Sequence, residues 1–226
     1  MKGSGDSSWF DGTKAVNDSF LSKFNRQFIE MALQLVPKWL QTYHLTAVTY
    51  VLAALSVLSG YLARTNSQWL WIMTFSIFCH YVTDALDGEV GRKRKTGLVR
   101  WGFYVDHFGD FLFSLCILIG LSYSTPPSLS RLWLVMMGAW SAFFLNAFML
   151  WILNKRYTIS LFRVSGIEVH FILGLLVACF AVLGPKALTF ALRLVVPASI
   201  LGLVILFFSI QKRLWREDMI RKKKKK

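Results

Sequence analysis

Six long apolar runs constrain the fold more than any other feature of this 226-residue chain. They cover residues 45–63, 67–86, 103–124, 130–153, 167–184 and 187–211. Each approaches or exceeds the length of about 18 residues at which an apolar stretch can cross a bilayer. In lipid, helices and closed barrels satisfy every backbone polar group, and these runs lack the apolar–polar alternation of barrel strands. We therefore predict an all-α integral membrane protein with six transmembrane helices.

The distribution of charge predicts how the chain crosses the membrane. The chain carries 26 Lys and Arg against 12 Asp and Glu. All but four of the basic residues lie in residues 1–44, the 92–100 loop, the 155–163 loop or the C-terminal tail, which six spans would place on one side. Because basic loops favour the cytoplasm, both termini are predicted to be cytoplasmic. Topology and attraction to anionic membrane lipid explain the charge, so we expect no nucleic-acid partner.

The chain divides into three predicted regions. Residues 1–44 form a cytoplasmic segment, 45–211 form the membrane domain, and 212–226 form a basic cytoplasmic tail. From Asp18, apolar residues recur at helical spacing until Pro37. This pattern predicts an amphipathic helix lying in the cytoplasmic membrane interface, and the alternative is a helix packed against the bundle.

Four aspartates near two neighbouring span ends are the strongest candidates for function. Asp84 and Asp87 are three residues apart, and Asp106 and Asp110 are four apart, so each pair shares one helix face. If the two spans pack antiparallel, the four carboxylates converge near the cytoplasmic boundary. Such a cluster would repel itself strongly unless cations neutralise it, and oxygen-only ligands suit Mg²⁺, Mn²⁺ or Ca²⁺. We therefore predict a site for divalent metal.

Residues around the aspartates point to a phosphorylated substrate. Gly88 and Gly102 lack side chains and would let a ligand or helix approach closely. Five basic residues lie in the 92–100 loop, where their charge suits phosphate: Arg92, Lys93, Arg94, Lys95 and Arg100. Metal ligands and a basic loop together predict that the substrate carries phosphate.

The segment DALDGEVGRKRKTGLVRWGFYVDHFGD, residues 84–110, closely resembles the signature of the CDP-alcohol phosphotransferases, D-x2-D-G-x2-A-R-x8-G-x3-D-x3-D. Seven of the eight defined positions are filled, by Asp84, Asp87, Gly88, Arg92, Gly102, Asp106 and Asp110. Gly91 stands where the signature has Ala, and nine residues instead of eight separate Arg92 from Gly102. The six predicted spans agree with the fold of that family.

The resemblance implies an enzyme that moves a phospho-alcohol group from a CDP-alcohol to an acceptor alcohol and releases CMP. It implies that Asp84, Asp87 and Asp106 ligate metal, with two divalent ions, Mg²⁺ or Mn²⁺, as cofactors. Asp110 would be a further ligand or the general base for the acceptor hydroxyl. Gly88, Arg92 and Gly102 would contact the CDP portion. Similar enzymes are often homodimers with a site open to the cytoplasmic interface.

Two further residues bear on the branch of the family. Family members use either CDP-diacylglycerol with a polar acceptor, or CDP-choline or CDP-ethanolamine with diacylglycerol. The Asp106-His107-x-x-Asp110 stretch and Glu168 resemble elements of the choline/ethanolamine branch. His107 would assist acceptor deprotonation or be a structural neighbour of the metal site, and Glu168 would contact the headgroup or pair with Arg163. The other histidines, His44, His80 and His170, are interpreted as structural.

A different class of function is the main alternative. Intramembrane carboxylates also occur in cation transporters and channels, where polar groups spread through the membrane depth and helices are broken in paired halves. Here the carboxylates gather on one side and no internal repeat is visible. A family member that only binds lipid is a third possibility, which the intact set of four aspartates disfavours.

Overall fold

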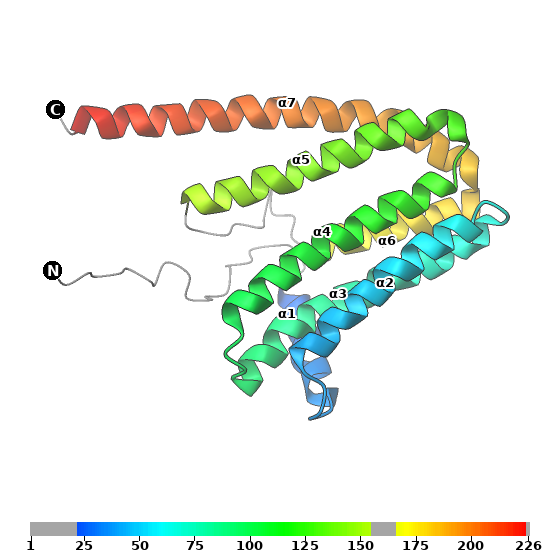
Figure 1. The fold of residues 1–226 in the computed structure, drawn as a ribbon, viewed down its shortest axis with the longest axis horizontal. Helices are drawn as coiled ribbons and strands as arrows, with labels where there is room; N and C mark the ends of the chain where they lie inside the picture. Colours follow the sequence, from blue (N-terminus) through cyan, green and yellow to red (C-terminus); the bar gives the residue numbers. More distant parts are fainter. Residues whose placement is uncertain (1–21, 155–165, 225–226) are drawn as a thin grey trace.

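The computed structural model describes residues 22–154 and 166–224. Over these ranges the chain forms helices and short connections, with no strand. The helices are α1 (Ser22–Leu35), α2 (Thr42–Leu62), η1 (Ser67–Trp69), α3 (Leu70–Arg94), α4 (Val99–Tyr123), η2 (Pro127–Leu129), α5 (Ser130–Asn154), α6 (Gly166–Leu183) and α7 (Pro185–Lys224). The connections after α2, α4 and α6 gather at one end of the molecule (Figure 1). The all-helical prediction is confirmed for the described residues.

Within the described part of the chain, four helical stretches are long and apolar enough to cross a membrane: Thr42–Leu62, Arg100–Tyr123, Pro127–Leu150 and Pro185–Lys222. The predicted spans at 67–86 and 167–184 do form helices, α3 and α6, but neither belongs to this set. Within α3, His80, Asp84 and Asp87 lower the hydropathy of the inner half, where inner denotes the end of the bundle at which α3 ends and α4 begins. The apolar part of α6, Glu168–Leu183, is shorter than the others.

Helices α2, α3, α4 and α6 form the packed centre of the molecule. The side chains of Met73 and Ile77 on α3 are fully buried, as is Val177 on α6. Helix α2 crosses α4 at Gly60 and Gly120, and a Cβ added to Gly60 would collide with the Gly120 carbonyl. Small residues at a helix crossing let the backbones approach closely, as in many membrane bundles. This close crossing sets how α2 lies against the helix that carries Asp106 and Asp110.

Helices α5 and α7 lie side by side along the edge of the molecule opposite α2 and α3 (Figure 1). Gly202 on α7 faces the Phe143 ring of α5, and α5 contacts α4 through a 2.8 Å hydrogen bond from Trp140 Nε1 to Ser114 Oγ. Helix α7 has 40 residues, so at 1.5 Å per residue it is about 60 Å long. The basic segment predicted as a separate tail from residue 212 continues this helix as far as Lys224.

Helix α1 packs against the inner half of α3. Tyr81 Oη donates a 2.6 Å hydrogen bond to Asn25 Oδ1, and the Phe28 ring stacks on Tyr81. Apolar residues of α1 also pack against Leu86 and Val90. The opposite face exposes Met31 and Leu35, among others. The sequence left open whether this helix also packs against the bundle, and that contact is present. The predicted N-cap, Asp18, lies outside the described residues.

A tight turn joins α3 to α4, and it is shorter than the predicted 92–100 loop. Three of the basic residues, Arg92, Lys93 and Arg94, occupy the last turn of α3, where positive charge is favourable at the negative end of the helix dipole. Lys95 ends α3 in the left-handed conformation with φ of 52°, and Gly97 follows with φ of 72°. This turn reverses the direction of the chain within a few residues, so the inner ends of α3 and α4 lie next to each other.

Candidate active site between α3 and α4

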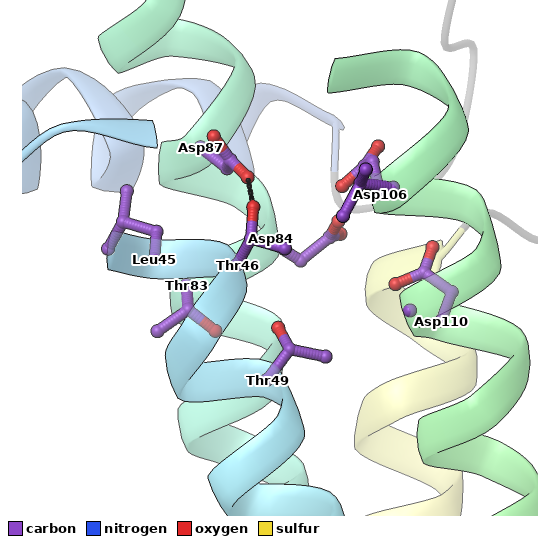
Figure 2. Close-up of a pocket in the computed structure, with 10 residues that line it drawn as sticks. Leu45, Thr46, Thr49, Thr83, Asp84, Asp87, Asp106 and Asp110 are labelled. Carbon is purple, nitrogen blue, oxygen red and sulfur yellow. Dashed lines mark hydrogen bonds between the residues drawn. The ribbon is translucent and has the colours of Figure 1, made fainter. Parts of the chain in front are cut away.

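Carboxylates from two helices meet at one point. Asp84 lies on α3, and Asp106 and Asp110 lie on α4, with one carboxylate oxygen of each within 4.8 Å of the others. In Figure 2 the Asp84 side chain extends across the gap toward Asp106. The three side chains are half-buried. Helices α3 and α4 run antiparallel but each packs most closely against α2, not against the other as predicted, and together they bring three of the four carboxylates into one cluster.

The fourth aspartate, Asp87, lines a small pocket together with the three clustered carboxylates. Thr46 Oγ1, on α2, donates a 2.8 Å hydrogen bond to Asp87 Oδ2, the bond drawn in Figure 2. All four aspartates line the pocket, together with Leu45, Thr46, Thr49, Thr83, Val105 and Gly109. Helix α2 therefore forms one wall of the site and orients one of its carboxylates.

The α2 wall was not among the predicted site residues. Thr46 and Thr49 both line the pocket, and with Thr42 they recur at helical spacing along α2; all three are buried. That polar stripe was a usable signal, because a hydroxyl that faces lipid gains nothing whereas one that faces a polar site gains a partner. A stripe alone, however, does not reveal which neighbouring helix it faces.

A pair of histidines lies behind the carboxylate cluster. His80 on α3 is buried, and its Nε2 atom lies 3.4 Å from Asp110 Oδ1. Its Nδ1 atom lies 3.0 Å from Nε2 of His170 on α6. The His80 ring stacks on Phe113 with ring centroids 3.9 Å apart. Both histidines were interpreted as structural from the sequence, and the structure brings them to the back of the site.

His107, on α4, contacts both the backbone one turn earlier and the neighbouring Asp106. Its Nδ1 atom lies 2.9 Å from the carbonyl oxygen of Phe103, one turn earlier on α4, which is the geometry of a donated hydrogen bond. The same nitrogen lies 3.5 Å from Asp106 Oδ2. The ring also approaches Phe148 of α5, with centroids 6.0 Å apart. His107 thus lies beside Asp106, between α4 and α5.

Arg92 lies across the backbone of Gly88, one turn earlier on α3. A Cβ at Gly88 would stand 3.3 Å from Arg92 Nη2, and the guanidinium makes contacts of 3.2 and 3.0 Å with the two carboxylate oxygens of Glu89. Gly102 has open space where a side chain would be. Gly102 therefore leaves open space, whereas the space beside Gly88 is occupied by the Arg92 guanidinium, and neither glycine lines the pocket of the aspartates.

Gly91 explains one departure from the family signature. A Cβ at this position would lie 3.1 Å from Thr42 Cγ2, which is tighter than ordinary van der Waals contact. The alanine of the signature would therefore push against α2 in this chain. Glycine at residue 91 fits the close approach of α2 and α3 at their inner ends.

Glu168 lies in the first turn of α6 and is partly exposed. It is near enough to Tyr81 to act on it electrostatically, as Asp84 also does. The predicted alternative partner, Arg163, lies outside the described residues, as do Lys155 and Arg156. Glu168 is thus placed on the α6 side of the site and does not join the cluster of three carboxylates.

The donor set of the cluster suits a hard divalent cation. Three carboxylates this close would repel one another, and a bound cation would remove that repulsion. Oxygen donors alone favour Mg²⁺, Mn²⁺ or Ca²⁺ over zinc. Mg²⁺ in particular commonly takes one or two carboxylates and completes its coordination with water and substrate phosphate. The residues present therefore fit the predicted metal.

The model of the CDP-alcohol phosphatidyltransferase family matches residues 34–211, from the end of α1 through most of α7, and includes every helix that lines the site. A search of curated proteins found no significantly similar sequence. Because the family match covers most of the chain, this protein belongs to the CDP-alcohol phosphatidyltransferase family, a family of phosphate-group transferases in phospholipid synthesis.

Proposed function

We propose that this protein transfers the phospho-alcohol group of a CDP-alcohol to an acceptor alcohol in the membrane, with release of CMP. The observation that carries the proposal is the cluster of Asp84, Asp106 and Asp110, whose oxygens lie within 4.8 Å of one another inside the matched family region. A transporter would need polar groups along the membrane depth. The four site aspartates lie instead in one half of the bundle, between the middle of α3 or α4 and the turn that joins these helices.

Asp84, Asp87, Asp106 and Asp110 hold two divalent ions, Mg²⁺ or Mn²⁺, in this proposal. The cation supplies charge neutralisation for the diphosphate and for the departing CMP. Asp110 either completes the ligand set or accepts the proton of the acceptor hydroxyl. The hydrogen bond from Thr46 to Asp87 supports the proposal, because a ligand oxygen is usually oriented by a second hydrogen-bonding partner.

The CDP portion binds beside Gly88, Arg92 and Gly102. Support comes from the open space at Gly102 and from the guanidinium of Arg92, which lies over the Gly88 backbone. A guanidinium offers planar, bidentate donors that suit phosphate oxygens. Glu89 pairs with the same guanidinium and keeps it on this face of α3.

The acceptor binds on the side of the site bordered by α4, α5 and α6. His107 faces that side next to Asp106, and Glu168 borders it from α6. These two residues resemble those of the choline/ethanolamine branch, so we propose CDP-choline or CDP-ethanolamine as donor and diacylglycerol as acceptor. CDP-diacylglycerol with a polar acceptor alcohol is the alternative donor–acceptor pair.

The chain crosses the membrane six times with both termini in the cytoplasm. Helices α2 to α7 are the spans, with α3 made less apolar by its site residues and largely enclosed by its neighbours. Residues 1–44 then lie at the cytoplasmic interface, where the exposed side chains of Trp39 and Tyr43 suit the membrane boundary. The basic end of α7, from residue 212 to Lys224, lies on the same side. As in similar enzymes, we propose that the protein is a homodimer.

The proposal is tested with purified protein in lipid vesicles. Each CDP-alcohol is combined with each acceptor, with Mg²⁺, with Mn²⁺ or with chelator, and CMP and lipid product are measured. We expect metal-dependent formation of one lipid product. The Asp84→Asn variant should lose the activity, while the matched variant Asp218→Asn, at an exposed position of α7, should retain it. A wild-type protein that forms no CMP with any pair would disprove the proposed reaction.

A further inference from the structure

We infer that His80 is a positioning residue, which holds the Asp110 carboxylate in place through a chain of contacts, His170–His80–Asp110, that links α6, α3 and α4. The inference rests on the proposed function for the role of Asp110. It concerns a residue that the family signature does not contain, since that signature begins at Asp84.

The geometry of the chain is specific at both ends of the His80 ring. Nε2 of His80 lies 3.4 Å from Asp110 Oδ1, and Nδ1 lies 3.0 Å from Nε2 of His170. Helix α3 provides the ring, α4 provides the carboxylate and α6 provides the second histidine. One side chain therefore joins three helices directly behind the carboxylate cluster.

The His80 ring has little freedom to be elsewhere. Its exposed fraction is 1%, and it stacks face to face on Phe113, with an angle of 2° between the ring planes. Phe113 follows Asp110 by three residues, so both face α3 from the same side of α4. The stack fixes the plane of the imidazole, and that plane directs Nε2 at the carboxylate.

Electrostatics select the direction of the hydrogen bonds. A neutral imidazole carries one N–H, and a lone pair at Nε2 would face the lone pairs of the Asp110 carboxylate. With the hydrogen on Nε2 the ring donates toward Asp110, and Nδ1 then accepts a hydrogen bond from Nε2–H of His170. This arrangement gives each facing pair one donor and one acceptor.

The donor at Nε2 has no full hydrogen bond among the described residues, although it is completely buried. At 3.4 Å, Asp110 Oδ1 is beyond the usual N–H···O distance of about 2.9–3.0 Å. A buried donor without a partner is unfavourable, so a histidine here gains nothing for packing that an apolar residue would not also provide. Catalytic hydrogen bonds are often long before substrate binds, and a small movement of Asp110 completes this one.

The decisive experiment compares two substitutions of His80. If His80 acts only through packing, leucine should be the milder change, whereas if it acts through its N–H, glutamine should be the milder change. His80→Leu fills the apolar site without a donor, whereas His80→Gln keeps an amide N–H near the position of Nε2. We expect His80→Leu to lower kcat by about 10- to 100-fold, the usual loss when the orienting partner of a site carboxylate is removed, with KM for the CDP-alcohol nearly unchanged. His80→Gln should retain most of the activity.

A matched control lies one turn away on the same helix. Ser76 is fully buried and, among the described residues, its hydroxyl donates to the Ile72 carbonyl of its own helix, so Ser76→Ala should leave kcat and KM unchanged. If His80→Leu does not give folded protein, His170→Leu tests the outer link of the chain. It should lower kcat without changing KM, because His80 loses the donor that fixes its tautomer.

A second measurement separates this inference from the proposed reaction. Binding of Mn²⁺ alone to the purified wild-type protein and to both His80 variants is followed by electron paramagnetic resonance. We expect the affinity to fall by about 10-fold in His80→Leu and to remain close to wild type in His80→Gln. An inactive wild-type protein with this order of Mn²⁺ affinities would overturn the reaction but not the role of His80. Glutamine and leucine variants that are equally impaired, or both unimpaired, would overturn the role of His80.

Discussion

Thr46 Oγ1 donates a 2.8 Å hydrogen bond to Asp87 Oδ2 and thereby joins α2 to α3, which carries two of the four site aspartates. The two residues are 41 positions apart in the chain. It orients a carboxylate that otherwise stands apart from the cluster formed by Asp84, Asp106 and Asp110. The site is thus built from three helices, although its recognisable motif lies on two.

Removal of this hydroxyl should affect activity more than stability. Thr46→Val keeps the shape of the side chain and removes the donor, so Asp87 loses its orienting partner and we expect kcat to fall by about 10-fold or more. Interhelical hydrogen bonds in membrane proteins contribute only about 0.6 kcal/mol on average, so thermal unfolding in detergent should change little. Thr46→Ser keeps the donor and should remain active. Equal activity in the valine and serine variants would contradict the assigned role of Thr46.

Substitution of Asp110 separates its two proposed roles. Asp110→Asn removes a base without changing the size of the side chain, and loss of a general base typically lowers the rate by about 100- to 10,000-fold. If Asp110 is the base, turnover should fall much more than the affinity for a CDP-alcohol measured by titration calorimetry. Parallel loss of turnover and nucleotide affinity would assign Asp110 as a metal ligand only.

Arg92 should contribute to substrate affinity. Arg92→Gln removes a charged, bidentate donor beside Gly88, and we expect KM for the CDP-alcohol to rise by about 10-fold, as for loss of a charge-assisted hydrogen bond. The neighbouring Lys93→Gln removes the same charge from an exposed position and should leave KM nearly unchanged. A similar rise in both variants would point to general attraction of anionic substrate instead of a contact at residue 92.

The close crossing of α2 and α4 should tolerate no side chain. Gly60→Ala would drive a methyl group into the Gly120 carbonyl, and overpacking of this kind typically costs about 1–3 kcal/mol. The control is Gly138→Ala, because a Cβ at Gly138 meets no neighbouring atom. We expect the midpoint of thermal unfolding in detergent to fall for Gly60→Ala and to stay unchanged or rise for Gly138→Ala. Unchanged stability in Gly60→Ala would argue against this crossing.

Much of the fold follows from local patterns that each segment carries alone. Apolar runs long enough for a span predict the helices, and each of the six predicted runs corresponds to a helix in the described residues. The offsets within each aspartate pair place its members on one helix face, because an α-helix repeats every 3.6 residues. The short turn between the helices then suffices to bring the pairs close, so the cluster of Asp84, Asp106 and Asp110 could be predicted.

Helix ends and the extent of membrane spans were less predictable. The apolar run ends before Asp87, yet α3 continues to Arg94, because charged residues form a good helical turn at the negative end of the dipole. In the same way α7 runs on through its basic segment to Lys224. Hydropathy reports where lipid contact ends, and helix formation does not have to stop there.

The partners of the aspartates depended on tertiary structure. Periodicity assigns a residue to a face of its own helix, but which helix packs on that face is decided by the packing of the whole bundle. Thr46 therefore looked like one more residue of an apolar span, and His80 and His170, 90 positions apart, looked unrelated. Local spacing was enough for the carboxylates, which are neighbours in the chain, whereas the groups that orient them come from helices that only the folded protein brings together.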